Sequence, residues 1–219
     1  PITYRAESSI QTCSICHKEQ LTNAVCENSH FICDACHSYG TYAPVIAALR
    51  DSTEKDALLL LEKIMDLPSV HMHGPEHHAI VPCVLLTAFR NNGEHMNYDA
   101  ALSEICKRAK QVPGGTCGYW GVCGAAAGAG IFMSVMTGSS PLHKDAWPFP
   151  QKLVSIILSR LADVGGPRCC KRTSRIAIEE AVHFYSQFCS VNIPLSSITC
   201  KYCEDNRECI QEDCPYYPE

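Results

Sequence analysis

Cysteine and histidine supply most of the reactive side chains in this 219-residue chain, which contains sixteen cysteines and ten histidines. The cysteines form three groups along the sequence, and each group has its own spacing. The first residues contain neither a cationic nor an apolar segment, so we expect no secretion signal. In a reducing compartment, closely spaced cysteine pairs are more typical of metal or redox sites than of disulfides. We therefore expect metal chemistry.

The first group of cysteines predicts a structural zinc site. Two Cys-x2-Cys knuckles each present a pair of thiolates, and two such turns complete a tetrahedron around one ion. The predicted ligands are Cys13, Cys16, Cys33 and Cys36. Cys26 and His30 lie between the knuckles, and we interpret them either as packing residues or as half of a second metal site. The order of all six is similar to the start of a RING-type cross-braced finger. The final Cys-x2-Cys of that pattern does not follow, which argues against a ubiquitin-ligase function.

The second group is expected at the N-terminal ends of helices. Its members are Cys83, Cys123, Cys169 and Cys170. Unpaired N–H groups and the positive end of the helix dipole lower a thiol pKa there. If these helix ends converge with Cys117, the thiols form a pocket suited to an iron–sulfur cluster, a soft metal ion or a redox-active dithiol. They would then act as cofactor ligands and reacting groups. The alternative is a structural role in the core, which we expect for Cys106 and Cys189.

The stretch from Gly114 to Gly130 is uncharged and rich in glycine. Inside a helix, glycine costs roughly 1 kcal/mol against alanine, so its repetition needs a reason. We favour close approach of the backbone to a bound group beside Cys123. Tight packing between helices through Gly124 and Gly128 is the alternative. A dinucleotide fingerprint is excluded because no predicted strand precedes the glycines.

Four histidines lie in one short loop, in the order His71, His73, His77 and His78. Imidazoles bind metals and transfer protons near neutral pH. We expect the first two to bind a metal and the last two to act as general acid or base groups beside the thiol pocket. Glu76 is a spare carboxylate in the same loop. The alternative is a surface loop held by turn hydrogen bonds.

The third group of cysteines lies in the C-terminal tail, at Cys200, Cys203, Cys209 and Cys214. Proline follows the last of them, as is common in ferredoxin-type runs. We favour an iron–sulfur cluster here, with zinc as the alternative. A further possibility is that Cys200 and Cys203 join Cys26 and His30 and complete the missing half of a cross-brace.

Helical periodicity dominates the sequence between the first group and the tail, and no segment alternates long enough to predict a sheet. The predicted helices cover residues 43–50, 53–67, 82–91, 98–111, 123–136, 150–164 and 170–188. The predicted fold class is therefore mainly α. Residues 1–40 form a zinc-finger-like module, residues 41–190 a helical core with the Cys/His pocket, and residues 191–219 a cysteine-rich metal-binding tail.

Charge and hydropathy limit the partners. The net charge of −5 leaves no basic surface field, which argues against a nucleic acid partner. The longest uncharged stretch, residues 112–142, is interrupted by glycine and proline, so we predict a buried helix rather than a membrane span. We expect a cytoplasmic protein.

Three motifs resemble those of an uncharacterised prokaryotic domain family. They are His-x-His-Gly-Pro-Glu-His-His-Ala-Ile-Val-Pro from His71, Cys-Gly-x-Trp-Gly-x-Cys-Gly-Ala-x-x-Gly-x-Gly-Ile from Cys117, and Gly-Gly-Pro-Arg-Cys-Cys-Lys-Arg from Gly165. This resemblance implies an anaerobic source, methanogens included, and occasional fusion to a SAM-dependent methyltransferase. The chain is more loosely similar to proteins named for a redox-active Cys…Gly-Cys-Ala-x-x-Gly…Cys…Cys pattern. That similarity assigns the pattern to Cys83, Cys123 and Cys169 or Cys170, and it implies metal or redox chemistry.

Three hypotheses for function follow. The first is redox or sulfur handling at an iron–sulfur cluster held by three cysteines, with a small molecule or a sulfur or electron donor as partner. The second is a non-catalytic, zinc-stabilised scaffold or sensor that engages another protein, such as a methyltransferase. The third is a hydrolase or lyase with a metal held by His71, His73 or His77.

Overall fold

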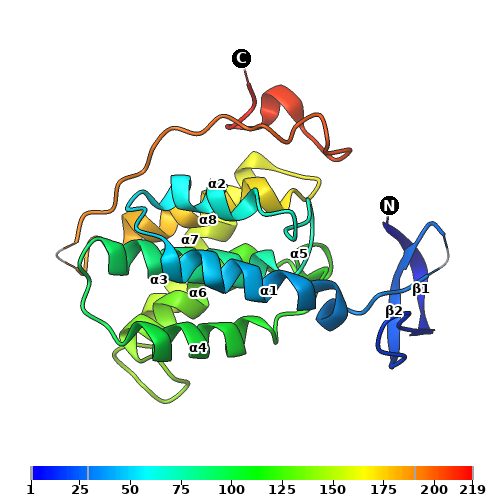
Figure 1. Ribbon diagram of the computed structural model, residues 1–219, viewed down its shortest axis with the longest axis horizontal. Helices are drawn as coiled ribbons and strands as arrows, with labels where there is room; N and C mark the ends of the chain where they lie inside the picture. Colours follow the sequence, from blue (N-terminus) through cyan, green and yellow to red (C-terminus); the bar gives the residue numbers. More distant parts are fainter. Residues whose placement is uncertain (1, 29, 190, 219) are drawn as a thin grey trace.

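The computed structural model describes residues 2–28, 30–189 and 191–218. In these residues the chain forms an N-terminal two-stranded hairpin, a bundle of helices and an irregular C-terminal tail (Figure 1). The strands are β1 (Ile2–Thr12) and β2 (Glu19–Cys26). The helices are α1 (Asp34–Asp51), α2 (Ala57–Met65), α3 (His77–Asn91), α4 (Tyr98–Ala109), α5 (Thr116–Tyr119), α6 (Gly124–Thr137), α7 (Pro148–Val164) and α8 (Cys170–Tyr185). The described part of the chain is therefore mainly helical, as predicted.

Helix α3 is the centre of the bundle and is buried from His77 to Phe89. It packs against α6, α4, α2, α8 and α1. The rings of Phe89, Phe132 and Tyr185 have centroids 4.7–5.4 Å apart and join α3, α6 and α8. Such aromatic contacts add to the burial of apolar surface that stabilises the core.

Local sequence signals set several helix ends. Asn97 caps α4 by accepting a hydrogen bond from the Ala100 N–H at 3.2 Å, and Gly165 ends α7, as predicted. Asp56 is the N-cap of α2 and accepts from two backbone N–H groups at 2.9 Å. A side-chain oxygen at this position satisfies donors that the first helical turn leaves unpaired. The helix therefore begins at Ala57 rather than at residue 53.

The prediction that Pro82 opens a helix is wrong, because α3 begins at His77 and Pro82 lies inside it. Proline has no N–H, so the carbonyl of His78, four residues earlier, receives no helical hydrogen bond from it. Helix α6 covers this carbonyl with Gly128. A Cβ added at Gly128 would lie 2.5 Å from the His78 oxygen and 2.9 Å from the Pro82 ring. The missing side chain at Gly128 therefore lets α6 pack directly against α3 at Pro82.

The hairpin was not predicted. Strands β1 and β2 pair antiparallel, with Thr12 opposite Glu19 and Ile2 opposite Cys26. Most of their side chains are exposed on both faces, so neither strand shows the alternation that marks a half-buried strand. The connecting turn carries the first cysteine knuckle, where the Cys13 N–H donates to the Lys18 carbonyl at 3.0 Å.

Helix α1 links the hairpin to the bundle. It starts at Asp34, inside the expected module of residues 1–40, and continues to Asp51, so the module and the core share one helix. The tail runs over α2 and α8 and has a 3-10 turn at Gln211–Asp213 as its regular element (Figure 1). Among the described residues, no helix is long and apolar enough to cross a membrane.

Candidate functional site

The four cysteines of the two knuckles form a group that can hold a metal ion. Their four sulfur atoms all lie within 4.8 Å of one another, and they belong to Cys13, Cys16, Cys33 and Cys36. The sulfurs of Cys16 and Cys33 are 3.7 Å apart. With zinc–sulfur bonds of about 2.3 Å, the sulfurs of a tetrahedral site are about 3.8 Å apart. The measured Cys16–Cys33 separation therefore matches a tetrahedral thiolate site, and all four sulfurs are close enough to share one ion.

Local structure positions these sulfurs. The first knuckle is the hairpin turn, and the second is the start of α1, where Cys33 is the N-cap. The backbone N–H of Cys33 donates to the Cys13 sulfur at 3.4 Å. Backbone N–H groups of Cys16 and Cys33 lower the pKa of Cys13 to about 6. At least one thiolate is thus available at neutral pH to start metal binding.

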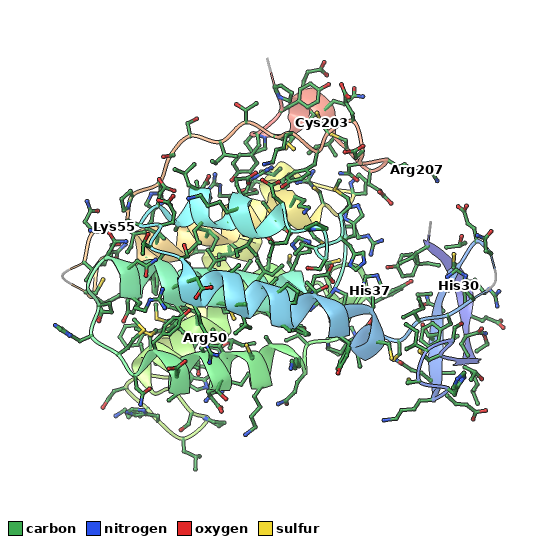
Figure 2. The ribbon with its side chains drawn as sticks, viewed as in Figure 1. His30, His37, Arg50, Lys55, Cys203 and Arg207 are labelled. Atoms are coloured by element: carbon green, nitrogen blue, oxygen red, sulfur yellow. The ribbon has the colours of Figure 1, made fainter. Side chains whose placement is uncertain are left out.

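Cys26 and His30 are not brought together with the tail cysteines. The backbone N–H of Cys26 donates to the His30 carbonyl at 3.0 Å, which closes a turn after β2. Figure 2 shows His30 on the hairpin side of the molecule and Cys203 on the tail, well separated. Among the described residues, neither metal-capable group combines them. The suggestion of a cross-brace through the tail therefore has no support from this arrangement.

The N-terminal ends of four helices, α1, α3, α6 and α8, meet at one end of the bundle. Asp34 accepts from the Gly114 N–H at 2.7 Å, which joins α1 to the loop before α5. The His78 ring occupies the space that a side chain at Gly124 would need. The Gly74 N–H faces the Cys170 thiol. We call this end the pole, defined by the first residues of these helices: Asp34, His77, Gly124 and Cys170.

Three of the predicted pocket cysteines lie at the pole. Cys123 is the N-cap of α6, and Cys170 is the first residue of α8. Cys123 lies within electrostatic range of both Cys117 and Cys170, because a thiolate at one position raises the pKa at its neighbour. Cys169 faces the opposite way. Burial raises its pKa, and the tail thiols Cys200 and Cys214 raise it further. The adjacent cysteines of α8 therefore belong to different groups.

Cys83 does not belong to the pole. It lies inside α3, with 1% of its surface exposed, and its sulfur is 3.7 Å from that of Cys106 in α4. The placement of Cys83 at a helix start was wrong, because α3 begins at His77. Cys106, expected to have a structural role in the core, is the partly buried member of a thiol pair with Cys83.

Burial outweighs the helix dipole at Cys123 and Cys170. It raises the pKa of Cys123, and it raises the pKa of Cys170 to about 12. The loss of solvation of a thiolate exceeds the favourable contribution of the helix N-terminus. These thiols are therefore protonated at neutral pH, and a metal ion is needed to ionise them. The prediction of thiolates activated by helix ends alone is not supported.

The four histidines of the loop point in different directions. His73 bonds to Asn206 and Glu208 of the tail at 3.0 and 3.2 Å. His78 bonds to the Val112 carbonyl at 3.1 Å. His77 is buried, and its ring contacts the His71 carbonyl at 3.0 Å and the Ser174 hydroxyl at 3.4 Å.

Burial lowers the pKa of His77 to about 4 and also lowers the pKa of His78. Both nitrogens of the His77 ring have partners within the protein. These contacts favour structural roles for His77 and His78 over proton transfer to a substrate.

His71 belongs to a group that sequence analysis missed in part. His71 Nδ1 lies 2.9 Å from Glu76 Oε1, and His37 Nδ1 lies 3.7 Å from Glu76 Oε2. Donor atoms of His37, His71 and Glu76 all lie within 4.8 Å of one another. His37 directly follows the ligand Cys36, but only the folded chain brings α1 beside the histidine loop. No spacing rule links residues so far apart in sequence.

The glycines of α6 clear space for protein rather than for a bound group. A side chain at Gly124 would collide with the His78 ring, and one at Gly128 would collide with α3. Tight helix packing, the alternative considered for this stretch, therefore explains both positions. Gly118 and Gly121 have no neighbour within 4 Å of an added Cβ.

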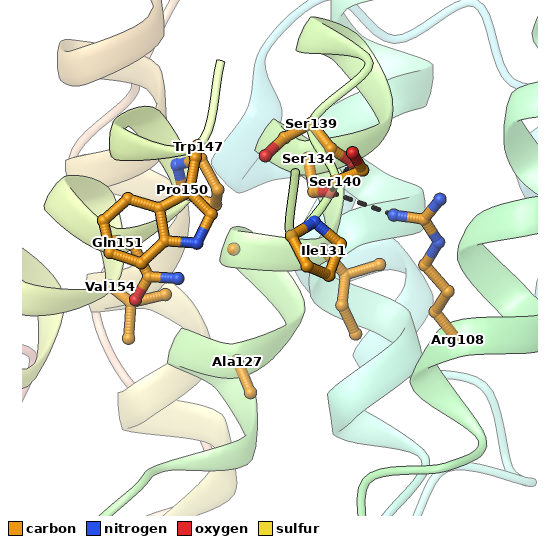
Figure 3. Close-up of a pocket in the computed structure, with 12 residues that line it drawn as sticks. Arg108, Ala127, Ile131, Ser134, Ser139, Ser140, Trp147, Pro150, Gln151 and Val154 are labelled. Carbon is orange, nitrogen blue, oxygen red and sulfur yellow. Dashed lines mark hydrogen bonds between the residues drawn. The ribbon is translucent and has the colours of Figure 1, made fainter. Parts of the chain in front are cut away.

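A cavity lies elsewhere in the bundle. It has a volume of about 450 Å³ and lies between α6 and α7, lined by Arg108, Ser134, Trp147 and Gln151 among others (Figure 3). Arg108 Nη1 donates to the Ser134 hydroxyl at 2.9 Å. No cysteine or histidine lines this cavity, so it is separate from the predicted thiol pocket.

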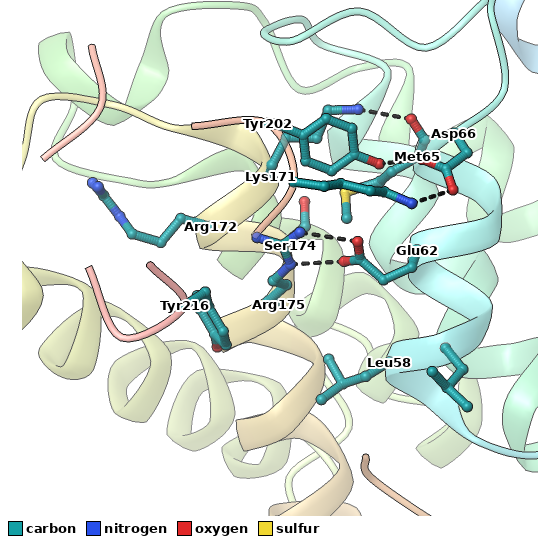
Figure 4. Close-up of polar contacts among 12 residues, drawn as sticks. Leu58, Glu62, Met65, Asp66, Lys171, Arg172, Ser174, Arg175, Tyr202 and Tyr216 are labelled. Atoms are coloured by element: carbon teal, nitrogen blue, oxygen red, sulfur yellow. Dashed lines mark hydrogen bonds and ion pairs between the residues drawn. The ribbon is translucent and has the colours of Figure 1, made fainter. Parts of the chain in front are cut away.

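The basic residues after Cys170 hold the tail. Lys171 and Arg175 are buried, and Arg175 forms two hydrogen bonds with Glu62 at 2.7 and 3.0 Å (Figure 4). The Lys171 ammonium donates to the Met65 carbonyl at 2.8 Å and lies 4.4 Å from the ring centre of Tyr202. These cations therefore connect α8 to α2 and the tail.

Comparison with known proteins identifies the helical part of the chain. Residues 45–217 match the model of a family of unknown function (DUF5714). The chain belongs to this family. The match includes the pole cysteines, the histidine loop and the tail, whereas the four-cysteine module and His37 lie before it. No curated protein and no solved structure matches the chain.

Proposed function

We propose that this chain is a metalloprotein in which zinc organises the N-terminal module and a thiol-bound cluster at the pole carries out redox or sulfur chemistry. The observation that carries the metal assignment is the four-cysteine group, with its 3.7 Å sulfur separation. All four positions are thiolate donors, which suits zinc better than calcium or magnesium. With four protein ligands the site is closed, so its role is structural.

The pole is the proposed reaction centre. Three thiolates are available there, from Cys117, Cys123 and Cys170. A four-iron cluster held by three cysteines would keep one iron free to bind substrate. The N–H groups at the starts of α6 and α8 favour a negatively charged cluster. A bound cluster would supply electron transfer or sulfur binding. The helix N-termini would orient it, and the exposed Cys117 would leave it open to a small molecule from solvent.

The tail is proposed as a second metal-binding element. Cys169 lies within electrostatic range of Cys200 and Cys214. Cys203 and Cys209 lie on the same short stretch of the tail, between Cys200 and Cys214. We retain the iron–sulfur proposal for these cysteines, with Cys169 added as a candidate ligand.

Anaerobic purification with metal analysis and visible spectroscopy tests the proposal. We expect zinc, iron and acid-labile sulfide in the isolated protein, with broad visible absorption. Cys123→Ala should lose the part of the iron and absorption that belongs to the pole and keep the zinc. Cys189→Ala is the matched control, because Cys189 lies beyond α8, away from the pole, and bonds to the Val191 carbonyl. A colourless protein that holds only zinc, unchanged by Cys123→Ala, would refute the redox proposal.

A colourless zinc protein would favour a second function, a non-catalytic module that engages a protein such as a methyltransferase domain. The observation behind this alternative is an apolar pair on the hairpin. Ile10 and Leu21 are cross-strand partners, and 66% and 67% of their surfaces are exposed. Contiguous exposed apolar surface marks a candidate protein interface, and these two side chains are neighbours on one face of the hairpin. Co-purification of the full chain with a methyltransferase domain, abolished by Leu21→Lys, is the outcome expected for this alternative.

A further inference from the structure

We propose that His37, His71 and Glu76 form a second metal site, which binds one divalent first-row cation such as Zn²⁺ or Fe²⁺ where the cysteine module meets the helical core. The site has a different ligand class from the four-cysteine site. It does not depend on the cluster proposed at the pole, because none of its ligands is a cysteine.

The three donors come from three segments that fold to one point. His37 is in the first turn of α1, His71 is in the loop before α3, and Glu76 is the N-cap residue of α3. Metal–ligand bonds of about 2.0–2.1 Å place the donors of a tetrahedral site about 3.3–3.4 Å apart. The two nitrogen–oxygen distances, 2.9 and 3.7 Å, lie on either side of that value. Small rotations of the side chains would therefore accommodate an ion.

Unsatisfied polar atoms point to a missing partner. Glu76 is fully buried, with 0% of its surface exposed, and its Oε2 has no hydrogen-bond partner. The Nδ1 atom of His37 is also buried and has none. At 3.7 Å the two atoms are too far apart for a hydrogen bond. Buried polar groups are almost always paired, and a buried carboxylate without full pairing is expensive. One cation between these atoms would satisfy both.

The surroundings prepare the carboxylate for this role. Gly74 leaves the space that Glu76 occupies, since a side chain at residue 74 would collide with the carboxylate. The backbone N–H of His71 donates to Glu76 Oε1 at 3.1 Å. The His77 ring contacts the His71 carbonyl at 3.0 Å and so holds the loop that carries the ligand. Neighbouring hydrogen bonds of this kind orient metal ligands and fix their geometry.

The donor set indicates which cation binds and what it can do. Two imidazoles and one carboxylate suit zinc or iron(II) and leave coordination positions open to water or a small ligand. The histidines are partly exposed, at 26% for His37 and 49% for His71, so an ion can reach the site from solvent. His37 neighbours Cys36 of the four-cysteine site, whereas His71 and Glu76 lie in the family domain. A bound ion would therefore clamp the module onto the core.

Cobalt titration of the chelator-stripped, reduced full chain tests the inference. Co²⁺ bound by thiolates shows intense sulfur-to-metal charge transfer, whereas Co²⁺ bound by nitrogen and oxygen shows only weak d–d absorption. We expect Glu76→Gln to bind one Co²⁺ fewer per chain than the wild type and to lose weak absorption only. The thiolate charge-transfer intensity should stay unchanged. Glu208→Gln is the matched control, because Glu208 also contacts a histidine, His73, at 3.2 Å but has no third ligand.

A second variant guards against misfolding of the buried substitution. His37→Gln changes a partly exposed side chain, should keep the far-UV circular dichroism and melting temperature of the wild type, and should lose the same Co²⁺. The inference is overturned if Glu76→Gln and His37→Gln, both folded, bind as much Co²⁺ as Glu208→Gln. A loss of thiolate absorption alone would concern the cysteine sites and would also contradict it.

Discussion

Substitution of Gly128 by alanine tests whether the glycine-rich stretch exists for contact between α3 and α6. The added Cβ would lie 2.5 Å from the His78 carbonyl oxygen and 2.9 Å from the Pro82 ring. Neither obstacle is the end of a flexible side chain. Ordinary contact begins at 3.4 Å, so the helices must separate locally by 3.4 − 2.5, or about 0.9 Å.

The expected effect is a net loss of stability. Overpacking of a core costs up to about 3 kcal/mol. We use this upper value because α3 is buried on all sides and cannot move toward solvent. Alanine regains about 1 kcal/mol of helix propensity. We therefore expect Gly128→Ala to lower the free energy of unfolding by about 2 kcal/mol. For a chain of this length that corresponds to a melting temperature about 4–8 °C lower.

Gly40→Ala is the matched control for this experiment. Gly40 lies inside α1, and an added Cβ there meets nothing within 4 Å. The same substitution should therefore raise stability by about 0.5–1 kcal/mol. Urea unfolding followed by far-UV circular dichroism measures both variants. If Gly128→Ala is as stable as Gly40→Ala, contact between α3 and α6 does not explain the glycine, and space for a bound group becomes the better explanation.

Two further predictions concern metal removal and tail docking. If zinc rather than an apolar core stabilises the module, as proposed, a chelator should make residues 13–36 sensitive to protease while the helical circular dichroism is kept. Metal-independent protection of these residues would contradict the zinc assignment. Glu62→Gln should lower the free energy of unfolding by about 3 kcal/mol and expose the tail to protease, because Arg175 then keeps a buried charge without its anion. Glu54→Gln is the matched control, because the partner of Glu54 is the exposed Lys63. It should change the free energy of unfolding by less than about 1 kcal/mol.

Short-range features were predictable because they depend on neighbours in the chain. The knuckles Cys13–Cys16 and Cys33–Cys36 gather into one group, as their spacing indicated. The cap at Asn97 and the end of α7 at Gly165 also follow from single residues and their intrinsic preferences. The hairpin was not predicted because its strands bury few side chains, so the sequence there shows no hydrophobic alternation.

Features at long range required the fold. Cys169 and Cys170 are adjacent in sequence, yet the start of α8 turns one toward the tail and the other toward the pole. Cys83 pairs with Cys106 because the partners of α3 are set by packing of the whole bundle. The pKa values of Cys123 and Cys170 are raised rather than lowered as predicted, because burial depth is a property of the tertiary structure.

The sequence by itself determined that two cysteine knuckles form one group able to hold a metal ion and that the core is helical, since both depend on spacings within a few turns of chain. The tertiary structure alone decided which helix ends meet and which side chains they share. It made Gly124 and Gly128 packing positions for α3. It also placed His37 beside His71 and Glu76, because burial of the apolar faces of the helices brings these segments to one pole.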